Sequence, residues 1–258
     1  MVDGLRRRLG LGRRPRKNDC PLWRTGESVL NRHERRLFSQ NGEDGILEAI
    51  FERVKPLSQT FVEFGVEDGS ECNTAYLVRN KRWSGYFIEG DPVKYRALER
   101  NYRRYSRVKT ANEMITAENI VPIFERLGVP LEFDLLSIDI DGNDYWVWRA
   151  LKGYRPRVVS IEFNLAFPPP TRWVMAYNPD HRWDDTSYFG ASLSSLCALG
   201  EKMGYAFLTM DCNAVNAFFL RKDLLADSGL ESPRPEEVFH FPPSFPRHPY
   251  RAGRSVEL

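Results

Sequence analysis

Thr60-Phe61-Val62-Glu63-Phe64-Gly65-Val66-Glu67-Asp68-Gly69-Ser70 is a short apolar run that ends in an acidic turn punctuated by glycine. β-Branched and aromatic residues indicate a buried strand, and a glycine turn between a strand and a helix is typical of a nucleotide-binding loop. Glycine is needed there because it adopts backbone angles that a side chain forbids and lets a ligand approach the main chain. Gly65 and Gly69 stand four residues apart with Glu67 between them, so the spacing differs from the G-x-G-x-x-G of dinucleotide-binding proteins.

Length and composition indicate one α/β domain with appendages. The chain has 258 residues, of which 42% are hydrophobic and 28% charged, as is ordinary for a globular protein with a sizeable core. No apolar run approaches the ~20 residues that span a bilayer, and none resembles the core of a signal peptide. The four cysteines are scattered without a C-x-x-C pair, which argues against a disulfide framework or a zinc site. We therefore expect a cytoplasmic protein.

Positive charge is concentrated at the N-terminus. Residues 1–20 hold seven Lys or Arg and two Asp or Glu, a net charge of +5, whereas the whole chain carries +2 and the remainder therefore −3. We predict that residues 1–35 form a flexible basic segment, with weak contact to an anionic membrane surface as an alternative to a purely solvated tail. The mildly acidic remainder predicts no nucleic-acid partner.

Strand-like and helix-like segments alternate along the next part of the chain. This alternation implies right-handed crossovers and a parallel sheet with helices on both faces. After the strand in residues 60–64, we expect strands at 85–89, 107–111, 133–139 and 157–163. The expected helices run from an N-cap at Asn41 to Pro56, over 74–80, from an N-cap at Asp91 and Pro92, and over 117–127 and 145–151.

The segment after residue 190 discriminates among variants of the doubly wound fold. Ser192 is expected to cap a helix that ends at Gly204. Two strand-like runs, Tyr205–Met210 and Ala214–Leu220, are then separated by only three residues, which demands an antiparallel hairpin. The fold predicted for residues 36–225 is a doubly wound, Rossmann-like, mostly parallel seven-stranded sheet with a C-terminal antiparallel hairpin strand. Residues 226–258 are proline-rich and are predicted to form a tail or arm.

Polar side chains follow each of the first five strands. Because the carboxyl ends of parallel strands meet at one edge of a doubly wound sheet, where ligands bind, we predict a ligand site there. Glu89 stands where an acidic side chain can accept both ribose hydroxyls of a nucleoside, and Asp91 is assigned only as a helix cap. The predicted site residues at this edge are Glu63, Gly65, Glu67, Gly69, Glu89, Asn112, Asp139, Asp141, Asp144, Glu162 and Asn164.

Asp139-Ile140-Asp141 after the fourth strand is compatible with a divalent cation, because hard oxygen ligands suit Mg²⁺ or Mn²⁺. One interpretation is a metal-dependent glycosyltransferase that binds a nucleotide-sugar through Asp139 and Asp141. A second is an O-methyltransferase in which Mg²⁺, held by Asp139, Glu162 and Asn164, lowers the pKa of a substrate hydroxyl. A third is that Asp141 or Asp144 caps the next helix and no metal binds.

The order and spacing of six segments resemble an FkbM-type class I S-adenosylmethionine-dependent methyltransferase. These segments are 61–70, 86–92, 133–148, 158–164, 190–193 and 216–221. The resemblance implies the class I methyltransferase fold, S-adenosylmethionine as methyl donor, and a sugar or natural-product hydroxyl as acceptor. Under this resemblance Glu67 or Asp139 would pair with the ammonium group of the cofactor, and Asn112 would hydrogen-bond the adenine edge.

A long aromatic loop, Leu165–Phe189, separates the fifth strand from the Ser192 helix. Loops of this length in compact domains are usually lids or binding loops, and Trp and Tyr beside carboxylates suit carbohydrate. The alternative is a cluster that only covers the sheet edge. Our hypothesis is that His181 is the general base, because an imidazole can abstract a proton near pH 7.

The sequence thus predicts an S-adenosylmethionine-dependent O-methyltransferase that acts on a small-molecule or saccharide acceptor. The metal-dependent glycosyltransferase and a methyltransferase-like binding protein without catalysis are the alternatives. The sequence carries no indication of the oligomeric state.

Overall fold

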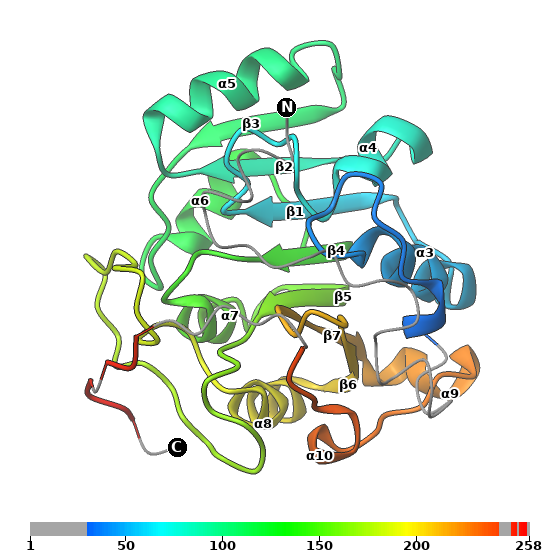
Figure 1. Ribbon diagram of the computed structural model, residues 1–258. Coiled ribbons are helices and arrows are strands. Elements are labelled where there is room, and N and C mark those ends of the chain that lie inside the picture. The colour runs from blue at the N-terminus through cyan, green and yellow to red at the C-terminus, as the bar shows by residue number, and fades with distance from the viewer. Residues whose placement is uncertain (1–29, 243–248, 252, 257–258) are drawn as a thin grey trace.

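The computed structural model describes residues 30–242, 249–251 and 253–256, so most of the predicted basic segment lies outside the described residues (Figure 1). In the described part a seven-stranded sheet has the strand order β3-β2-β1-β4-β5-β7-β6. The strands are β1 (Thr60–Phe64), β2 (Ser84–Glu89), β3 (Val108–Asn112), β4 (Glu132–Ile138), β5 (Arg155–Glu162), β6 (Tyr205–Met210) and β7 (Asn216–Arg221). The α-helices are α3 (Glu43–Val54), α4 (Ala75–Lys81), α5 (Pro92–Tyr102), α6 (Ile120–Leu127), α7 (Asp144–Ala150), α8 (Leu193–Met203), α9 (Leu225–Ser228) and α10 (Pro235–Val238), and the 3-10 helices are η1 (Asn31–His33) and η2 (Lys222–Leu224).

Strand pairing confirms the predicted fold class. Strands β1 to β5 pair in parallel, whereas β7 is antiparallel to both β5 and β6. The second strand of the hairpin therefore inserts between β5 and β6, and β6 runs in the same direction as the parallel strands. This is a class I methyltransferase fold. The start of β7 consequently joins the ends of β1 to β5 at one edge of the sheet, which we call the carboxyl edge.

Two helical layers cover the sheet because its strands are apolar on both sides (Figure 1). Helices α3, α4 and α5 bury residues such as Ile46, Val78 and Leu98 against one face. Helices α6, α7 and α8 bury residues such as Phe124 and Trp148 against the other. Asp91 and Ser192 cap α5 and α8 as predicted, and their side chains accept backbone N–H groups of the first turn.

The predicted helix start at Asn41 is wrong. Helix α3 begins at Glu43, and its N-cap is Gly42, whose φ of 130° favours glycine. The Glu43 carboxylate accepts the backbone N–H groups of Asn41 and Gly42. The buried Asp44 carboxylate accepts three further backbone N–H groups, those of residues 37–39. The first helical turn therefore holds the preceding loop, and in return the Ser39 hydroxyl accepts the backbone N–H of Asp44 at 3.2 Å. Asn41 does not cap the helix.

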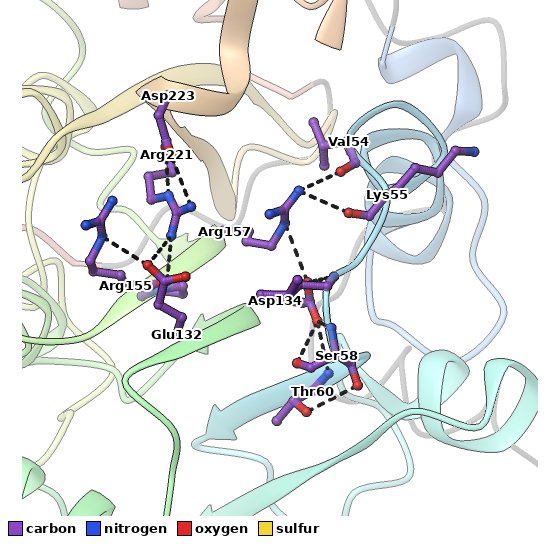
Figure 2. Close-up of polar contacts among 12 residues, drawn as sticks. Val54, Lys55, Ser58, Thr60, Glu132, Asp134, Arg155, Arg157, Arg221 and Asp223 are labelled. Atoms are coloured by element: carbon purple, nitrogen blue, oxygen red, sulfur yellow. Dashed lines mark hydrogen bonds and ion pairs between the residues drawn. The ribbon is translucent and has the colours of Figure 1, made fainter. Parts of the chain in front are cut away.

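At the opposite edge of the sheet, Asp134 on β4 is fully buried and accepts hydrogen bonds from the residues that precede β1 (Figure 2). The donors are the backbone N–H groups of Leu57 (2.5 Å), Ser58 (2.8 Å) and Thr60 (3.2 Å), together with the Ser58 hydroxyl (3.0 Å). Arg157 Nε on β5 lies 3.6 Å from the Asp134 carboxylate. This group ties the entry of β1 to the neighbouring strands.

Residues 30–35 pack against the β6–β7 hairpin. Asn31 is fully buried, and its amide donates to the Met210 carbonyl at 2.7 Å. Glu34 Oε1 accepts from the Asn31 amide (2.7 Å) and from the Cys212 backbone N–H (2.8 Å). Burial, with repulsion from Asp211, raises the pKa of Glu34 to about 9.

We expect the pH dependence of stability to change in the Glu34→Gln variant. Because the folded-state pKa of Glu34 is raised, its stabilisation is fully present below the ordinary value of 4.5 and is lost as pH rises toward 9. Glutamine keeps the acceptor oxygen but does not ionise. As the pH rises from 5 to 9, the free energy of unfolding measured in urea should therefore fall in the wild type relative to the variant, by at most about 1.4 kcal/mol per pH unit. Parallel pH profiles for the two proteins would contradict this account.

The C-terminal arm returns to the carboxyl edge, where it lies beside the 165–189 loop (Figure 1). Met175 and Ser255 form a β-bridge, and the Tyr188 hydroxyl donates to the Arg254 carbonyl at 2.8 Å. Arg251 forms an ion pair with Asp184. The arm therefore braces the loop that carries His181. The division of the chain at residues 35 and 225 stays a prediction.

Among the residues described, no helix is long and apolar enough to cross a membrane. Cys72 and Cys197 are free, whereas Cys212 is disulfide-bonded. The expectation that the chain lacks disulfides is therefore wrong for Cys212. Cytoplasmic localisation stays a prediction, and a disulfide does not favour it, because disulfides persist mainly in oxidising compartments.

Candidate functional site

A cavity of about 850 Å³ opens at the carboxyl edge of the sheet. Its volume falls within the range of about 300–1,000 Å³ that is usual for small-molecule sites. The loops after β1, β2, β3, β4 and β5, the start of β7 and residues 179–183 all contribute to its wall. Eight predicted site residues line it, namely Glu63, Gly65, Glu67, Glu89, Asp139, Asp141, Glu162 and His181, whereas Gly69, Asn112, Asp144 and Asn164 do not.

Glu89 is the best-placed of the predicted cofactor residues. It ends β2, is 7% exposed, and its two carboxylate oxygens accept backbone N–H groups of Glu67 (2.7 Å) and Asp91 (2.8 Å). Each oxygen keeps a further lone pair, because an ionised carboxylate offers about four acceptor sites. Burial raises the pKa of Glu89. Its position at the end of β2 suits acceptance of a pair of ligand hydroxyls.

Gly65 and Gly69 are needed for reasons of packing. A Cβ on Gly65 would lie 1.5 Å from the backbone carbonyl oxygen of Asp139, and φ at Gly65 is 77°. A Cβ on Gly69 would lie 2.5 Å from the Tyr102 ring, and φ there is 70°. Gly65 therefore permits close approach of the loops after β1 and β4. Gly69 permits α5 to pack on the turn, and its predicted contact with a ligand has no support in this geometry.

Glu63 is a buried organising carboxylate. Its oxygens accept the backbone N–H groups of Asn73 (2.8 Å) and Thr74 (3.0 Å), the Thr74 hydroxyl (2.6 Å) and the Ser137 hydroxyl (3.1 Å). Most of its acceptor capacity is therefore used within the protein, although it lines the cavity. Burial raises its pKa. Its main effect is to hold the loop after β1 in place.

Asn112 turns away from the cavity. Its amide donates to the backbone carbonyls of Glu89 (2.7 Å) and Gly90 (3.2 Å), so it supports the end of β2. The wall here is formed instead by Met114 and Ile115, which the sequence analysis did not single out. Met114 lies against Gly90, where a Cβ would be 2.8 Å from its methyl carbon. Asn112 was conspicuous in the sequence because it is a polar residue at the end of a strand, whereas apolar residues after a strand carried no signal.

Asp139, Asp141 and Glu162 come together at the ends of β4 and β5. Each offers a carboxylate oxygen, and these atoms lie within 4.8 Å of one another. Burial, reinforced by the other carboxylates of this edge, raises the pKa of Asp139 and that of Glu162 well above their ordinary values. Asp144 lies behind them, where its oxygens accept the backbone N–H groups of Ile140 and Gly142 at 2.9 Å. Asp144 thus holds the preceding loop. The expectation that Asp141 or Asp144 caps the next helix is wrong, because the N-cap of α7 is Asn143 and no side chain in the described part of the chain caps this helix.

Asn164, the third predicted metal ligand, is not part of this group. It is 1% exposed, and its amide donates to the carbonyls of Ser187 (2.9 Å) and Phe189 (2.8 Å). Its side-chain oxygen accepts the Ala166 backbone N–H at 3.0 Å. These bonds fasten the 165–189 loop to the end of β5. The prediction that Asp139, Glu162 and Asn164 together bind a metal is therefore wrong, because Asn164 does not lie with the other two.

His181 reaches the cavity from the 165–189 loop. Its ring lies over Gly142, where a Cβ would be 2.5 Å from Cδ2 of the imidazole, so glycine is required beneath it. Nε2 is buried and has no hydrogen-bond partner in the described chain. Burial lowers the pKa of His181, although a hydrogen bond with the Asp141 backbone opposes this shift. The ring is therefore neutral near pH 7 and has a nitrogen free to accept a proton.

The cavity is strongly acidic. Among the described residues, only Lys94 and Arg182 contribute basic side chains to its wall, and Lys94 is paired with Glu67 at 2.7 Å. The acidic lining residues are Glu43, Glu63, Glu67, Glu71, Glu89, Asp91, Glu113, Asp139, Asp141 and Glu162. A site of this charge favours a cationic ligand and disfavours a polyanionic one.

No family model and no curated protein match this chain. Among solved structures, it is similar to the N-terminal domain of EvdMO1 with SAH bound (15% identity, 71% of this chain and 80% of that chain covered, TM-score 0.44). It is also similar to the CMeT domain of the citrinin polyketide synthase (11%, 69% and 51%, TM-score 0.45). A third similar structure is that of M. capricolum TrmK in complex with S-adenosyl-homocysteine (13% identity, 63% of this chain and 62% of that chain covered, TM-score 0.38). At these identities and TM-scores, none of the likenesses establishes a shared activity, and the FkbM family stays a prediction.

Proposed function

We propose that this protein is an S-adenosylmethionine-dependent methyltransferase that methylates a hydroxyl group of a saccharide or secondary metabolite. The observation that carries the proposal is the acidic cavity at the carboxyl edge of a doubly wound sheet. Ligands of such sheets bind at this edge. Ten carboxylic residues against two basic ones favour a ligand with positive charge. The sulfonium and ammonium groups of S-adenosylmethionine meet this requirement.

Three parts of the wall match three parts of the cofactor. Glu89 at the end of β2 has lone pairs available for the two ribose hydroxyls. Ile88, Met114 and Ile115 offer apolar surface for the adenine ring. Asp139 suits the ammonium group better than Glu67 does, because Glu67 already forms an ion pair with Lys94.

The proposed reaction needs few catalytic groups. The bound cofactor supplies an electrophilic methyl group. Methyl transfer to an acceptor oxygen would release S-adenosylhomocysteine, and Nε2 of His181 would accept the proton of the acceptor hydroxyl. The protein thus contributes mainly alignment of the two substrates and a base that is neutral near pH 7. The bracing of the 165–189 loop by the C-terminal arm keeps His181 in position.

The proximity of Asp139 and Asp141 is compatible with the glycosyltransferase alternative, but the charge of the cavity opposes it. A nucleotide-sugar carries a pyrophosphate, whose negative charges the acidic wall would repel. A binding protein without catalysis would retain the cofactor site, and binding of S-adenosylhomocysteine without turnover on any acceptor would favour it.

The proposal is tested by calorimetric titration of the Glu89→Gln variant with S-adenosylhomocysteine. Hydrogen bonds to a charged acceptor contribute about 1.5–3 kcal/mol, so we expect affinity to fall about 10- to 100-fold. Glu132→Gln is the matched control, because Glu132 lies at the opposite edge of the sheet and is partly exposed. It should bind as the wild type does. If Glu89→Gln bound S-adenosylhomocysteine as tightly as the wild type does, Glu89 would not be the residue that accepts the ribose hydroxyls.

A further inference from the structure

Asp139 and Glu162 have no basic counterpart among the residues that the structure describes. Glu162 Oε2 is buried and accepts no hydrogen bond within the same residues. Buried carboxylates are normally paired, hydrogen-bonded or bound to a metal.

A second, independent feature lies on β7. Asn216 is 2% exposed and lines the cavity, and it is the direct antiparallel partner of Glu162 on β5. Its amide nitrogen donates to Glu43 at 3.0 Å, yet Oδ1 is buried with no partner in the described residues. Side chains of directly opposed residues point to the same face of a sheet with their Cβ atoms about 4.5–5.5 Å apart. A buried amide oxygen without a donor requires an explanation, because nearly all buried polar atoms in folded proteins are satisfied.

We infer that Asp139, Asp141, Glu162 and Asn216 bind one divalent cation. All four ligands would be oxygen atoms, which are preferred by Mg²⁺, Mn²⁺ and Ca²⁺. Ligand distances of about 2.1–2.5 Å place opposite ligands about 4.2–5.0 Å apart, and the three carboxylates already lie within 4.8 Å of one another. A cation would satisfy both the Glu162 carboxylate and the Asn216 oxygen.

This ligand set differs from the one that the sequence suggested. Asn164 is replaced by Asp141, from the loop after β4, and by Asn216, from the hairpin strand. The pairing of β7 with β5 is what brings Asn216 to the carboxyl edge. A motif search along the chain does not find it, because 54 positions separate Asn216 from Glu162.

The cation has a role in the reaction that rests on the proposed function. The site shares its cavity with His181, which also hydrogen-bonds the Asp141 backbone. A hydroxyl that binds a divalent cation is more acidic, and its proton is more easily removed by a neighbouring base. Acceptors with two adjacent hydroxyls, as in many saccharides, would bind such a cation through both oxygens.

The test uses the full-length chain, stripped of metal with EDTA and titrated with Mn²⁺ while the signal of the free ion is followed by electron paramagnetic resonance. We expect one Mn²⁺ site per chain and at least a tenfold loss of affinity in Glu162→Gln and in Asn216→Ala. Glu132→Gln should bind as the wild type does. Asp141→Asn gives a variant whose exposed side chain does not endanger folding, and it should also weaken binding.

Absence of Mn²⁺ binding to the wild type, or equal Mn²⁺ affinity in Asp141→Asn and wild type, would overturn the inference. S-adenosylhomocysteine is titrated into the same metal-free sample. If the cofactor binds and Mn²⁺ does not, the proposed cation site is wrong and the proposed function stands. If Mn²⁺ binds and the cofactor does not, the proposed function is wrong and the cation site stands.

Discussion

Asp134→Ala is expected to lower the free energy of unfolding by about 3–5 kcal/mol, the usual cost of removing one member of a buried ion pair. The mutation would leave Arg157 without its carboxylate, and it would leave the N–H groups of Leu57, Ser58 and Thr60 without an acceptor (Figure 2). Because these contacts tie the entry of β1 to β4 and β5, the loss affects the centre of the sheet. The loss of free energy of unfolding is measured by urea unfolding monitored by circular dichroism.

The matched control for this prediction is Glu132→Ala on the same strand. Glu132 forms ion pairs of similar length with Arg155 (3.6 Å) and Arg221 (3.4 Å), but its side chain is 46% exposed. Exposed ion pairs contribute at most about 1 kcal/mol, so this variant should stay within 1 kcal/mol of the wild type. An Asp134→Ala variant as stable as Glu132→Ala would show that the buried group is not a major source of stability.

His181→Ala is expected to lower kcat by about 10²–10⁴-fold, the usual contribution of a general base. The measurement is release of S-adenosylhomocysteine with a saccharide acceptor identified by screening the wild type. Because the imidazole is assigned to the acceptor proton, the affinity for S-adenosylhomocysteine should change less than threefold. This combination distinguishes a catalytic role from a general disruption of the cavity.

His240→Ala is the control for the base assignment. His240 Nε2 lies 3.1 Å from the Cys212 carbonyl oxygen, and the residue does not line the cavity. The variant should retain wild-type kcat. If His181→Ala also retained it, His181 would not be the base, and its unpartnered Nε2 would need another explanation.

The fold was predictable because its signals are local. Alternation of apolar runs with helical patterns, and a short connection between the last two strands, defined the mostly parallel sheet and its hairpin. The connection spans residues 211–215, so it is two residues longer than expected, because β7 begins at Asn216 and not at Ala214. The caps at Asp91 and Ser192 were equally local, since each bonds N–H groups two or three residues away. The place of β7 between β5 and β6 was not predictable, because no local pattern specifies which strand of a hairpin joins the sheet.

The site was predictable only in its location. A polar residue at a strand end can face the ligand, as Glu89 does, or bond the neighbouring backbone, as Asn112 and Asn164 do. The choice depends on partners far along the chain, which spacing does not reveal. Asn216 was not predicted as a site residue for the same reason, because the sequence indicated only that it belongs to the last strand.

The central claim is that the acidic cavity binds S-adenosylmethionine. It is tested most directly by titrating the full-length wild-type protein with S-adenosylhomocysteine in a calorimeter at two temperatures, so that a small enthalpy at one of them does not conceal binding. The account predicts one site per chain with a dissociation constant in the micromolar range. No binding at either temperature, with or without Mn²⁺, would contradict it.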